Sequence, residues 1–152
     1  MTATALGLDF GTTNSVVALA AAGEAPEMVA FAGPEGVSAV FRSALCFWED
    51  GGVKVEAGPW AIAEYLEYPE GSRFLQSFKS VAASSAFEHA SVFDKRLRFE
   101  ELGRTFLAKL AAHSGGKLDA RPGRIVVGRP IEYAGSRPDP VLARQRYEAM
   151  FA

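Results

Sequence analysis

One short segment near the N-terminus, LDFGTTNS, combines residue types that suit phosphate binding. Gly11 has no Cβ, so a phosphate can approach its backbone closely. The backbone N–H groups from Gly11 to Asn14 can converge on an anion, and Thr12 and Thr13 add hydroxyl donors. Asp9 can hold Mg²⁺ directly or through water, because Mg²⁺ keeps much of its water and uses few carboxylates. The segment therefore predicts a phosphate-binding hairpin.

The predicted loop is not a Walker A motif, which reads G-x-x-x-x-G-K-[ST] and opens a helix. The residues around it instead indicate two strands joined by a turn, because apolar side chains alternate over 6–10 and resume over 16–19. An ordinary hairpin with a polar turn and an incidental aspartate is the simpler alternative.

The rest of the chain alternates between strand-like and helix-like segments. Strands are predicted at 27–31, 37–48, 53–57 and 125–127, and helices at 60–68, 99–113 and 141–151. The segment 73–83 fits either a strand or a helical turn, and residues 33–36 mark a candidate subdomain boundary. The 125–127 run is apolar without alternation, which is typical of a strand buried at the centre of a sheet.

The composition excludes several classes of protein. Of the 152 residues, 49% are apolar and 22% are charged, which is typical of a folded globular chain. No apolar stretch reaches the roughly 20 residues that a membrane-spanning helix needs. The single cysteine, Cys46, fits a reducing compartment, so a cytoplasmic location is expected. Because the net charge is only −2, neither nucleic acid nor a membrane surface is expected as a partner.

The charge is unevenly distributed along the chain. Residues 1–72 hold two basic and ten acidic side chains, whereas residues 73–152 hold fourteen basic and eight acidic ones. An asymmetry of this kind suggests that one face of the molecule is positive and binds an anion. A solvated surface without a ligand explains it equally well.

The sequence GLDFGTTNSVVALA resembles the first phosphate motif of the actin, hexokinase and heat-shock ATPase superfamily. Within that superfamily it is most similar to the seventy-kilodalton, DnaK-like heat-shock chaperone family. Later segments agree in order. VFRSALCFWEDGGVKVEAG resembles the family's next strand pair, and FLQSFKSVA lies where the family carries its catalytic lysine. RIVVGRPIEY resembles the strand that ends in its switch proline, ARQRYEAM resembles the following helix, and the form VVGRP is similar to shorter, divergent members.

The resemblance implies a site for ATP or ADP with Mg²⁺. Asp9 would hold the magnesium through its water shell, while Gly11, Thr12 and Thr13 would wrap the β- and γ-phosphates. Lys79 would reach the γ-phosphate and help to place the attacking water, so Asp9 and Lys79 are the expected catalytic residues. Phosphoryl transfer needs positioning and charge neutralisation more than covalent chemistry, which agrees with these residue types.

Three further residues gain a role only through the resemblance. Pro130 would be the switch that couples the nucleotide state to subdomain motion, with Arg144 or Arg146 beside it. Taken alone, Pro130 is a strand terminator, and the two arginines fit the polar face of the last helix. Lys79 taken alone is an ordinary solvated lysine.

The resemblance also implies the fold. We expect an α/β chain that forms a partial, ribonuclease-H-like half-lobe of the actin-like ATPase type, with a smaller inserted α+β subdomain. The half-lobe would use residues 1–33 and 121–152, and the insertion would use residues 34–120. The first three strands would run antiparallel, and the 125–127 strand would lie parallel to the first.

No second phosphate loop of the D-x-G-G-G-T kind follows residue 15. The expectation is therefore an N-terminal fragment of a DnaK-like, chaperone-type ATPase, with the missing second lobe as its partner. Such a piece would bind ATP weakly or not at all and would not turn it over, because charges in an open, wet site are screened. Its exposed strand edges could pair two copies into a homodimer. Two alternatives stay open: a fragment of a sugar or acetate kinase of the same superfamily, and a non-catalytic interaction module.

Overall fold

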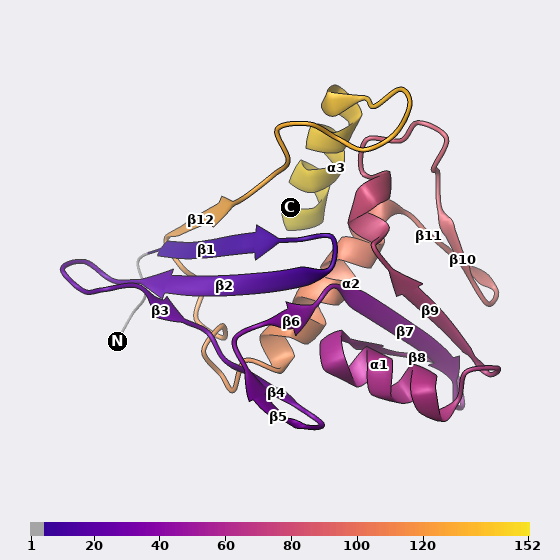
Figure 1. Ribbon diagram of the computed structural model, residues 1–152, viewed down its shortest axis with the longest axis horizontal. Coiled ribbons are helices and arrows are strands. Elements are labelled where there is room, and N and C mark those ends of the chain that lie inside the picture. Colours follow the sequence, from indigo (N-terminus) through magenta and orange to yellow (C-terminus); the bar gives the residue numbers. More distant parts are fainter. Residues whose placement is uncertain (1–4) are drawn as a thin grey trace.

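A five-stranded sheet carries the N-terminal hairpin (Figure 1). The structure, a computed structural model, describes residues 5–152. The strand order is β12–β1–β2–β3, and β6 also pairs with β2. These strands are β1 (Ala5–Phe10), β2 (Asn14–Ala20), β3 (Glu27–Met28), β6 (Phe41–Arg42) and β12 (Arg124–Val127). As the resemblance implies, β1 runs antiparallel to β2 and parallel to β12.

A second sheet, with three strands, lies beside the first. Its order is β8–β7–β9, both pairings are antiparallel, and helix α1 packs against β7. The elements of this part are β7 (Ala44–Glu49), β8 (Val53–Ala57), α1 (Gly58–Glu67), β9 (Ser72–Gln76) and a short 3₁₀ helix, η1 (Phe78–Val81). There are also two small hairpins, formed by β4 (Phe31–Gly33) with β5 (Gly36–Ser38) and by β10 (Ala90–Val92) with β11 (Lys95–Leu97).

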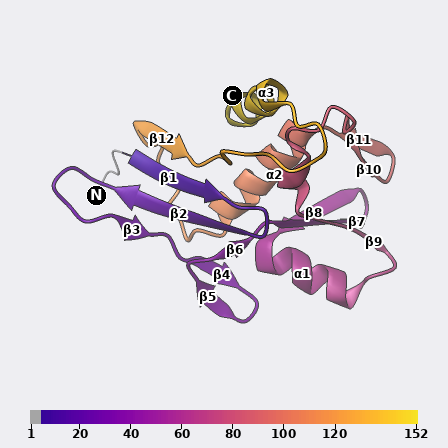
Figure 2. The ribbon, with the colours of Figure 1, turned by 45° about the horizontal axis from the view of Figure 1, so that its top comes forward.

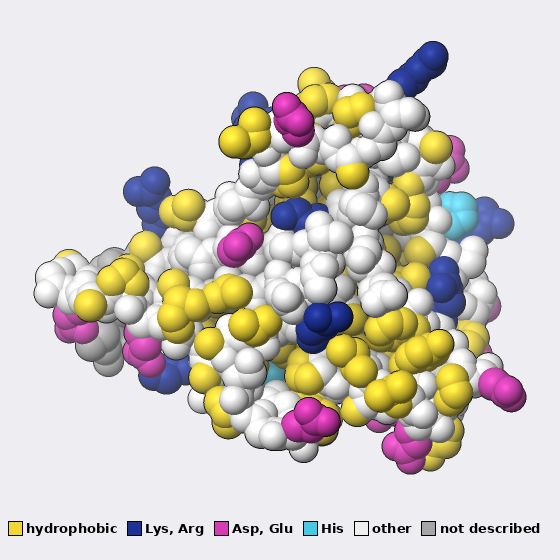
Figure 3. All heavy atoms as spheres, in the orientation of Figure 1, with side chains coloured by type: hydrophobic (Ala, Val, Ile, Leu, Met, Phe, Trp, Pro, Cys, Tyr) yellow, Lys and Arg dark blue, Asp and Glu magenta, His cyan; other side chains and the backbone are white. Residues whose placement is uncertain are grey.

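The two faces of the five-stranded sheet have different surroundings. Leu8, Phe10 and Val17 are buried on one face, behind which helix α2 (Phe99–Ala112) lies in both ribbon views (Figures 1 and 2). Asp9 and Val16 are direct cross-strand partners, and they project from the opposite face because side chains alternate along a strand. Figure 3 shows this outer face, with charged side chains near its centre and hydrophobic ones gathered below them and over α1.

Helix α2 forms because its apolar residues recur at helical spacing. Phe99, Leu102, Phe106 and Leu110 are all buried, as the periodicity predicts. At the start of the helix, the Glu101 carboxylate accepts the backbone N–H of Arg98 at 2.7 Å, which satisfies a donor that the helix cannot pair internally. The stripe presses α2 onto the sheet that carries the hairpin.

Helix α3 (Pro140–Phe151) begins at the position that the sequence indicates. The Asp139 carboxylate accepts the N–H groups of Val141 and Leu142, each at 3.0 Å, and proline occupies the first helical position. The helix packs against α2 through its buried Tyr147 and Met150.

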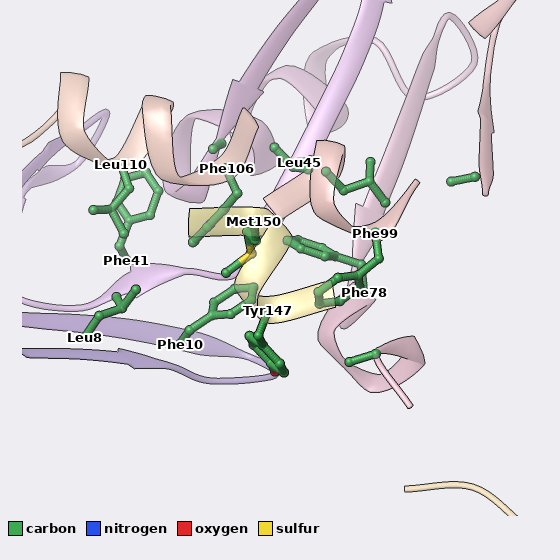
Figure 4. Packing of buried hydrophobic residues seen from close by; sticks show 14 of the residues in the cluster. Leu8, Phe10, Phe41, Leu45, Phe78, Phe99, Phe106, Leu110, Tyr147 and Met150 are labelled. Atoms are coloured by element: carbon green, nitrogen blue, oxygen red, sulfur yellow. The ribbon is translucent and has the colours of Figure 1, made fainter. Parts of the chain in front are cut away.

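An aromatic cluster joins these elements at the end of β1 (Figure 4). The ring centroid of Phe10 lies 5.4 Å from that of Phe106 in α2, 5.7 Å from that of Phe78 in η1 and 6.5 Å from that of Tyr147 in α3. Burial of a side chain of this kind contributes about 1.5–3 kcal/mol. Because Phe10 lies between Asp9 and Gly11, the core anchors the strand that leads into the predicted phosphate loop.

The structure corrects the prediction for the 125–127 strand. β12 lies at the edge of its sheet, where β1 is its partner among residues 5–152. Ile125 and Val126 are 48% and 50% exposed rather than buried. An unbroken apolar run indicates neighbours on both faces and both edges, and β12 lacks a neighbour on one edge within the described chain.

Several predicted boundaries also change. Glu27–Met28 is the part of the predicted 27–31 strand that pairs with β2, and the chain then leaves the sheet to form β4. The predicted 37–48 strand is divided among β5, β6 and β7, and residues 33–36 form the turn between β4 and β5. The undecided segment 73–83 contributes to β9 and η1.

The chain is α/β in class, as predicted, with one mixed sheet, three antiparallel sheets and three α-helices among the described residues. The main hydrophobic cluster draws on both predicted subdomain segments, and the division at residues 34 and 120 stays a prediction. Within residues 5–152, no helix is both long enough and apolar enough to cross a membrane.

Candidate phosphate-binding site

The predicted loop is a tight turn that closes β1 onto β2. The N–H of Gly11 donates to the carbonyl oxygen of Asn14 at 2.9 Å. A Cβ on Gly11 would lie far inside van der Waals contact with that same oxygen, so the turn requires glycine for its own closure. The Gly11 N–H is therefore not available to an anion, in contrast to the sequence prediction.

The tip of the turn presents its donors to solvent. Thr12 and Thr13 are exposed, and their backbone N–H groups make no backbone hydrogen bond within the described part of the chain. The carbonyl of Thr13 accepts the N–H of Ser43 at 2.8 Å, which ties the turn to the residue that follows β6. Two amides and two hydroxyls thus remain for an anion, on a turn that is fixed at both ends.

Asp9 lies on the outer face of β1, one residue before Phe10. Its side chain is exposed and forms no ion pair within residues 5–152. Gly128, just after β12, lies beside it, because a Cβ on Gly128 would come within 3.9 Å of Asp9 Oδ1. A free carboxylate with open space around it is a suitable ligand for Mg²⁺ or for its bound water.

Lys79, which is distant in sequence, reaches the same hairpin. It lies in η1, and its ammonium donates a hydrogen bond to the carbonyl oxygen of Phe10 and lies 5.6 Å from the centroid of the Phe10 ring. Burial lowers the pKa of Lys79, while the negative charge of Asp9 acts in the opposite direction. The structure therefore places the predicted lysine and the predicted carboxylate within electrostatic reach of each other.

Arg146 in α3 holds the segment that carries Lys79. Its guanidinium donates to the carbonyl oxygens of Val81, Ala82 and Ser84 at 2.8, 2.9 and 3.0 Å, and also to that of Phe87. All four acceptors belong to η1 or to the loop that follows it. The contacts of Arg146 are thus with the backbone of the lysine-bearing segment rather than with the turn.

The other two residues suggested by the resemblance lie differently. Arg144 is exposed on α3 and forms an ion pair with Glu148, one helical turn later, at 2.8 Å. Pro130 is half-buried and follows Gly128 by two residues, so it lies at the end of β12 that is next to Asp9. The structure brings Asp9, the turn and Lys79 together, with Pro130 nearby, and directs Arg144 to solvent.

Sequence reasoning missed Arg42. This residue is exposed on β6 and is the direct cross-strand partner of Asn14. It also lines an open cavity of about 580 Å³ between the β4–β5 hairpin and α1. The signal that could have found it is its charge, because Arg42 and Lys54 are the two basic residues among the first 72.

Within residues 5–152, no group of three or more His, Cys, Asp or Glu side chains is placed to hold a metal ion. A cation at Asp9 would therefore draw its remaining ligands from water and from a bound anion, which is the usual arrangement for Mg²⁺ with phosphates.

Comparison with known proteins gives no match to this chain, either among family models or among curated sequences.

Proposed function

We propose that this chain binds the phosphates of a magnesium nucleotide, ATP or ADP, at the β1–β2 turn, as part of a DnaK-like ATP-binding protein. The observation that carries the proposal is the position of Lys79. This residue is 69 positions away from Phe10 in sequence, yet its ammonium bonds the Phe10 carbonyl at the entrance to the turn. A hairpin that had a polar turn for structural reasons alone would not need a partly buried cation beside it.

The proposed roles follow from the groups that are present. The Thr12 and Thr13 amides and hydroxyls would donate to phosphate oxygens. Lys79 would supply a positive charge whose attraction for phosphate is screened less by water, because the side chain is partly buried. Asp9 would hold Mg²⁺ through its water shell. When bound, the cation neutralises part of the phosphate charge, which otherwise would repel Asp9.

The site is an open surface, so we expect weak binding and no turnover by this chain. The donors address an anion from one side, and water screens the opposite side. A millimolar dissociation constant corresponds to about 4 kcal/mol of binding free energy. This is the range that a few exposed, charge-assisted hydrogen bonds supply.

Backbone amide chemical shifts during a titration with Mg-ATP test the proposal, because they detect and locate millimolar binding. We expect shifts confined to residues 9–14, to residues 41–43, which pair with the start of β2 and bond the turn, and to the Lys79 segment. Asp9→Asn should weaken binding by about tenfold through loss of the magnesium contact. Asp94→Asn removes a charge from an exposed turn far along the chain and should bind as the parent does. Equal binding by both variants, or shifts elsewhere, would contradict the proposal.

A non-catalytic interaction module is the second candidate. The half-exposed Ile125 and Val126 on the edge of β12 support it, since apolar strand edges pair with other chains. The same titration separates the two functions, because an interaction module leaves the amides of the turn unmoved by Mg-ATP.

A further inference from the structure

Two cationic side chains flank the turn, one at each end. Lys79 contacts Phe10, which is the last residue of β1 before the turn. Arg42 pairs in register with Asn14, which is the first residue of β2 after it. Lys79 and Arg42 therefore come from different parts of the chain to the two strand ends that the turn joins.

The pairing register places Arg42 on the face that carries Asp9. Phe10, Ser15 and Phe41 occupy equivalent register positions and are all buried. Their neighbours Asp9, Asn14 and Arg42 are all exposed, and side chains directly opposite each other share a face. The carboxylate, the turn and the guanidinium thus belong to one outer surface, which is the surface that Figure 3 presents.

Arg42 has no acidic partner that would account for its charge. It forms no ion pair within the described residues, although Glu35 lines the same cavity. It is also an exception in its half of the sequence, where acidic side chains outnumber basic ones by ten to two. A free guanidinium beside a turn with free N–H donors is a common arrangement for recognising phosphate.

We propose that Arg42 is a second phosphate-binding side chain, and that the site selects a chain of two or more linked phosphates over a single one. The inference rests on the proposed function, to which it adds a residue and a substrate class. A single phosphate can contact the turn and one of the two cations. A linked chain can contact the turn, Lys79 and Arg42 together, and its greater negative charge uses both cations.

The test compares the magnesium complexes of tripolyphosphate and orthophosphate by amide chemical-shift titration. Arg42→Ala should weaken tripolyphosphate binding by about tenfold, the value of one charge-assisted contact, and should change orthophosphate binding by less than about twofold. Arg42→Lys keeps the charge but loses the two-pronged guanidinium, so we expect an intermediate loss. Arg96→Ala removes the same charge from an exposed strand in the β10–β11 hairpin and should have no effect.

The outcomes separate this inference from the function on which it rests. If Lys79→Ala and Asp9→Asn weaken tripolyphosphate binding while Arg42→Ala does not, Arg42 is no ligand and the phosphate site stands without it. If both anions lose affinity equally in Arg42→Ala, the selection of linked phosphates is wrong. If the parent chain shows no shifts at the turn with either anion, the proposed function and the role of Arg42 both fail. Arg42→Gln replaces Arg42→Ala should the alanine variant not fold.

Discussion

At the scale of single residues, Gly11 has a structural reason for being glycine that is independent of any ligand. Its position is set by the hydrogen bond to Asn14 and by the closeness of the Asn14 carbonyl. The space that the missing Cβ of Gly11 leaves is occupied by the Asn14 carbonyl rather than by a phosphate. The phosphate contacts then fall to Thr12 and Thr13, which lie at the exposed tip.

Gly11→Ala should destabilise the protein by about 2 kcal/mol, because the new Cβ must displace backbone atoms rather than a flexible side chain. Urea denaturation measures this as a lower midpoint with an unchanged m-value. Gly71→Ala is the matched control, since a Cβ there meets nothing within 4 Å. Equal midpoints for the two variants would show that the turn accommodates a side chain.

The lowered pKa of Lys79 predicts how phosphate binding depends on pH. Anion affinity should fall as pH rises through the pKa of Lys79, and thus at a lower pH than the roughly 10.4 of a free lysine. Asp9 opposes the effect of burial, so Asp9→Asn should lower the pKa of Lys79 further. The side-chain chemical shift of Lys79, followed against pH in the parent and in Asp9→Asn, shows which protein has the lower Lys79 pKa. An unchanged titration in the variant would contradict it.

The same shift has a consequence for stability, with a defined sign. The folded protein binds the Lys79 proton less tightly than the unfolded chain does. The charged lysine therefore costs stability at all pH values below its folded-state pKa. That cost is relieved as pH rises from the folded-state pKa toward the unfolded value of roughly 10.4.

At the scale of elements, the important joint is the one between α3 and η1. η1 is a 3₁₀ segment of four residues, which is too short to be stable by itself. Arg146 donates to the carbonyl of Val81 at the end of η1 and to that of Ala82 just after it. The N–H of Asp139 donates to the next carbonyl, that of Ala83, at 2.8 Å. The helix after β12 thus determines where the lysine of a preceding segment lies.

Arg146→Ala should destabilise the protein by about 2 kcal/mol, because the carbonyls of Ala82 and Phe87 lose their donor. The carbonyls of Val81 and Ser84 each lose one of two donors. Hydrogen exchange should accelerate most at residues 80–87, and phosphate binding should weaken as Lys79 loses its position. Arg144→Ala, two residues away on the solvent side of α3, is the control and should leave the exchange pattern unchanged. Uniform acceleration across the chain would argue against a local clamp.

The sequence predicts the helices and strands better than it predicts which other elements they contact. The hairpin, α2, α3 and the parallel pairing of the 125–127 strand follow from periodicity, caps and the resemblance, and the structure confirms them. The edge position of β12 could not be predicted, because an apolar run is the same whether or not a further strand pairs with it. The role of Arg146 as a clamp depends on carbonyl positions in a loop, which no sequence pattern specifies.

At the scale of the whole molecule, hydrophobic side chains are exposed on more than one surface. Val37 and Leu66 flank the cavity beside α1, while Ile125 and Val126 lie on the edge of β12. Such surfaces are usually covered by another chain or another part of the protein. The predicted homodimer through exposed edges remains a prediction, and β12 is where it can be tested.

Sedimentation velocity over a range of concentrations should show self-association that Val126→Lys weakens, because a charged side chain on an edge strand opposes pairing. Val141→Lys introduces the same charge at an exposed position of α3 and should associate as the parent does. A single monomeric species at every concentration would show that the edge of β12 does not pair.

Phe10 belongs to the core through its ring and to the candidate site through its carbonyl. Because core and site share this residue, a loss of function during evolution would change some site residues and leave others in place. A descendant that no longer bound a ligand would still keep Gly11 and Arg146, since each stabilises the fold. Asp9 and Arg42 have no such duty and would be free to drift. In proteins of this shape, therefore, those two exposed positions are the better guide to whether the site is still in use.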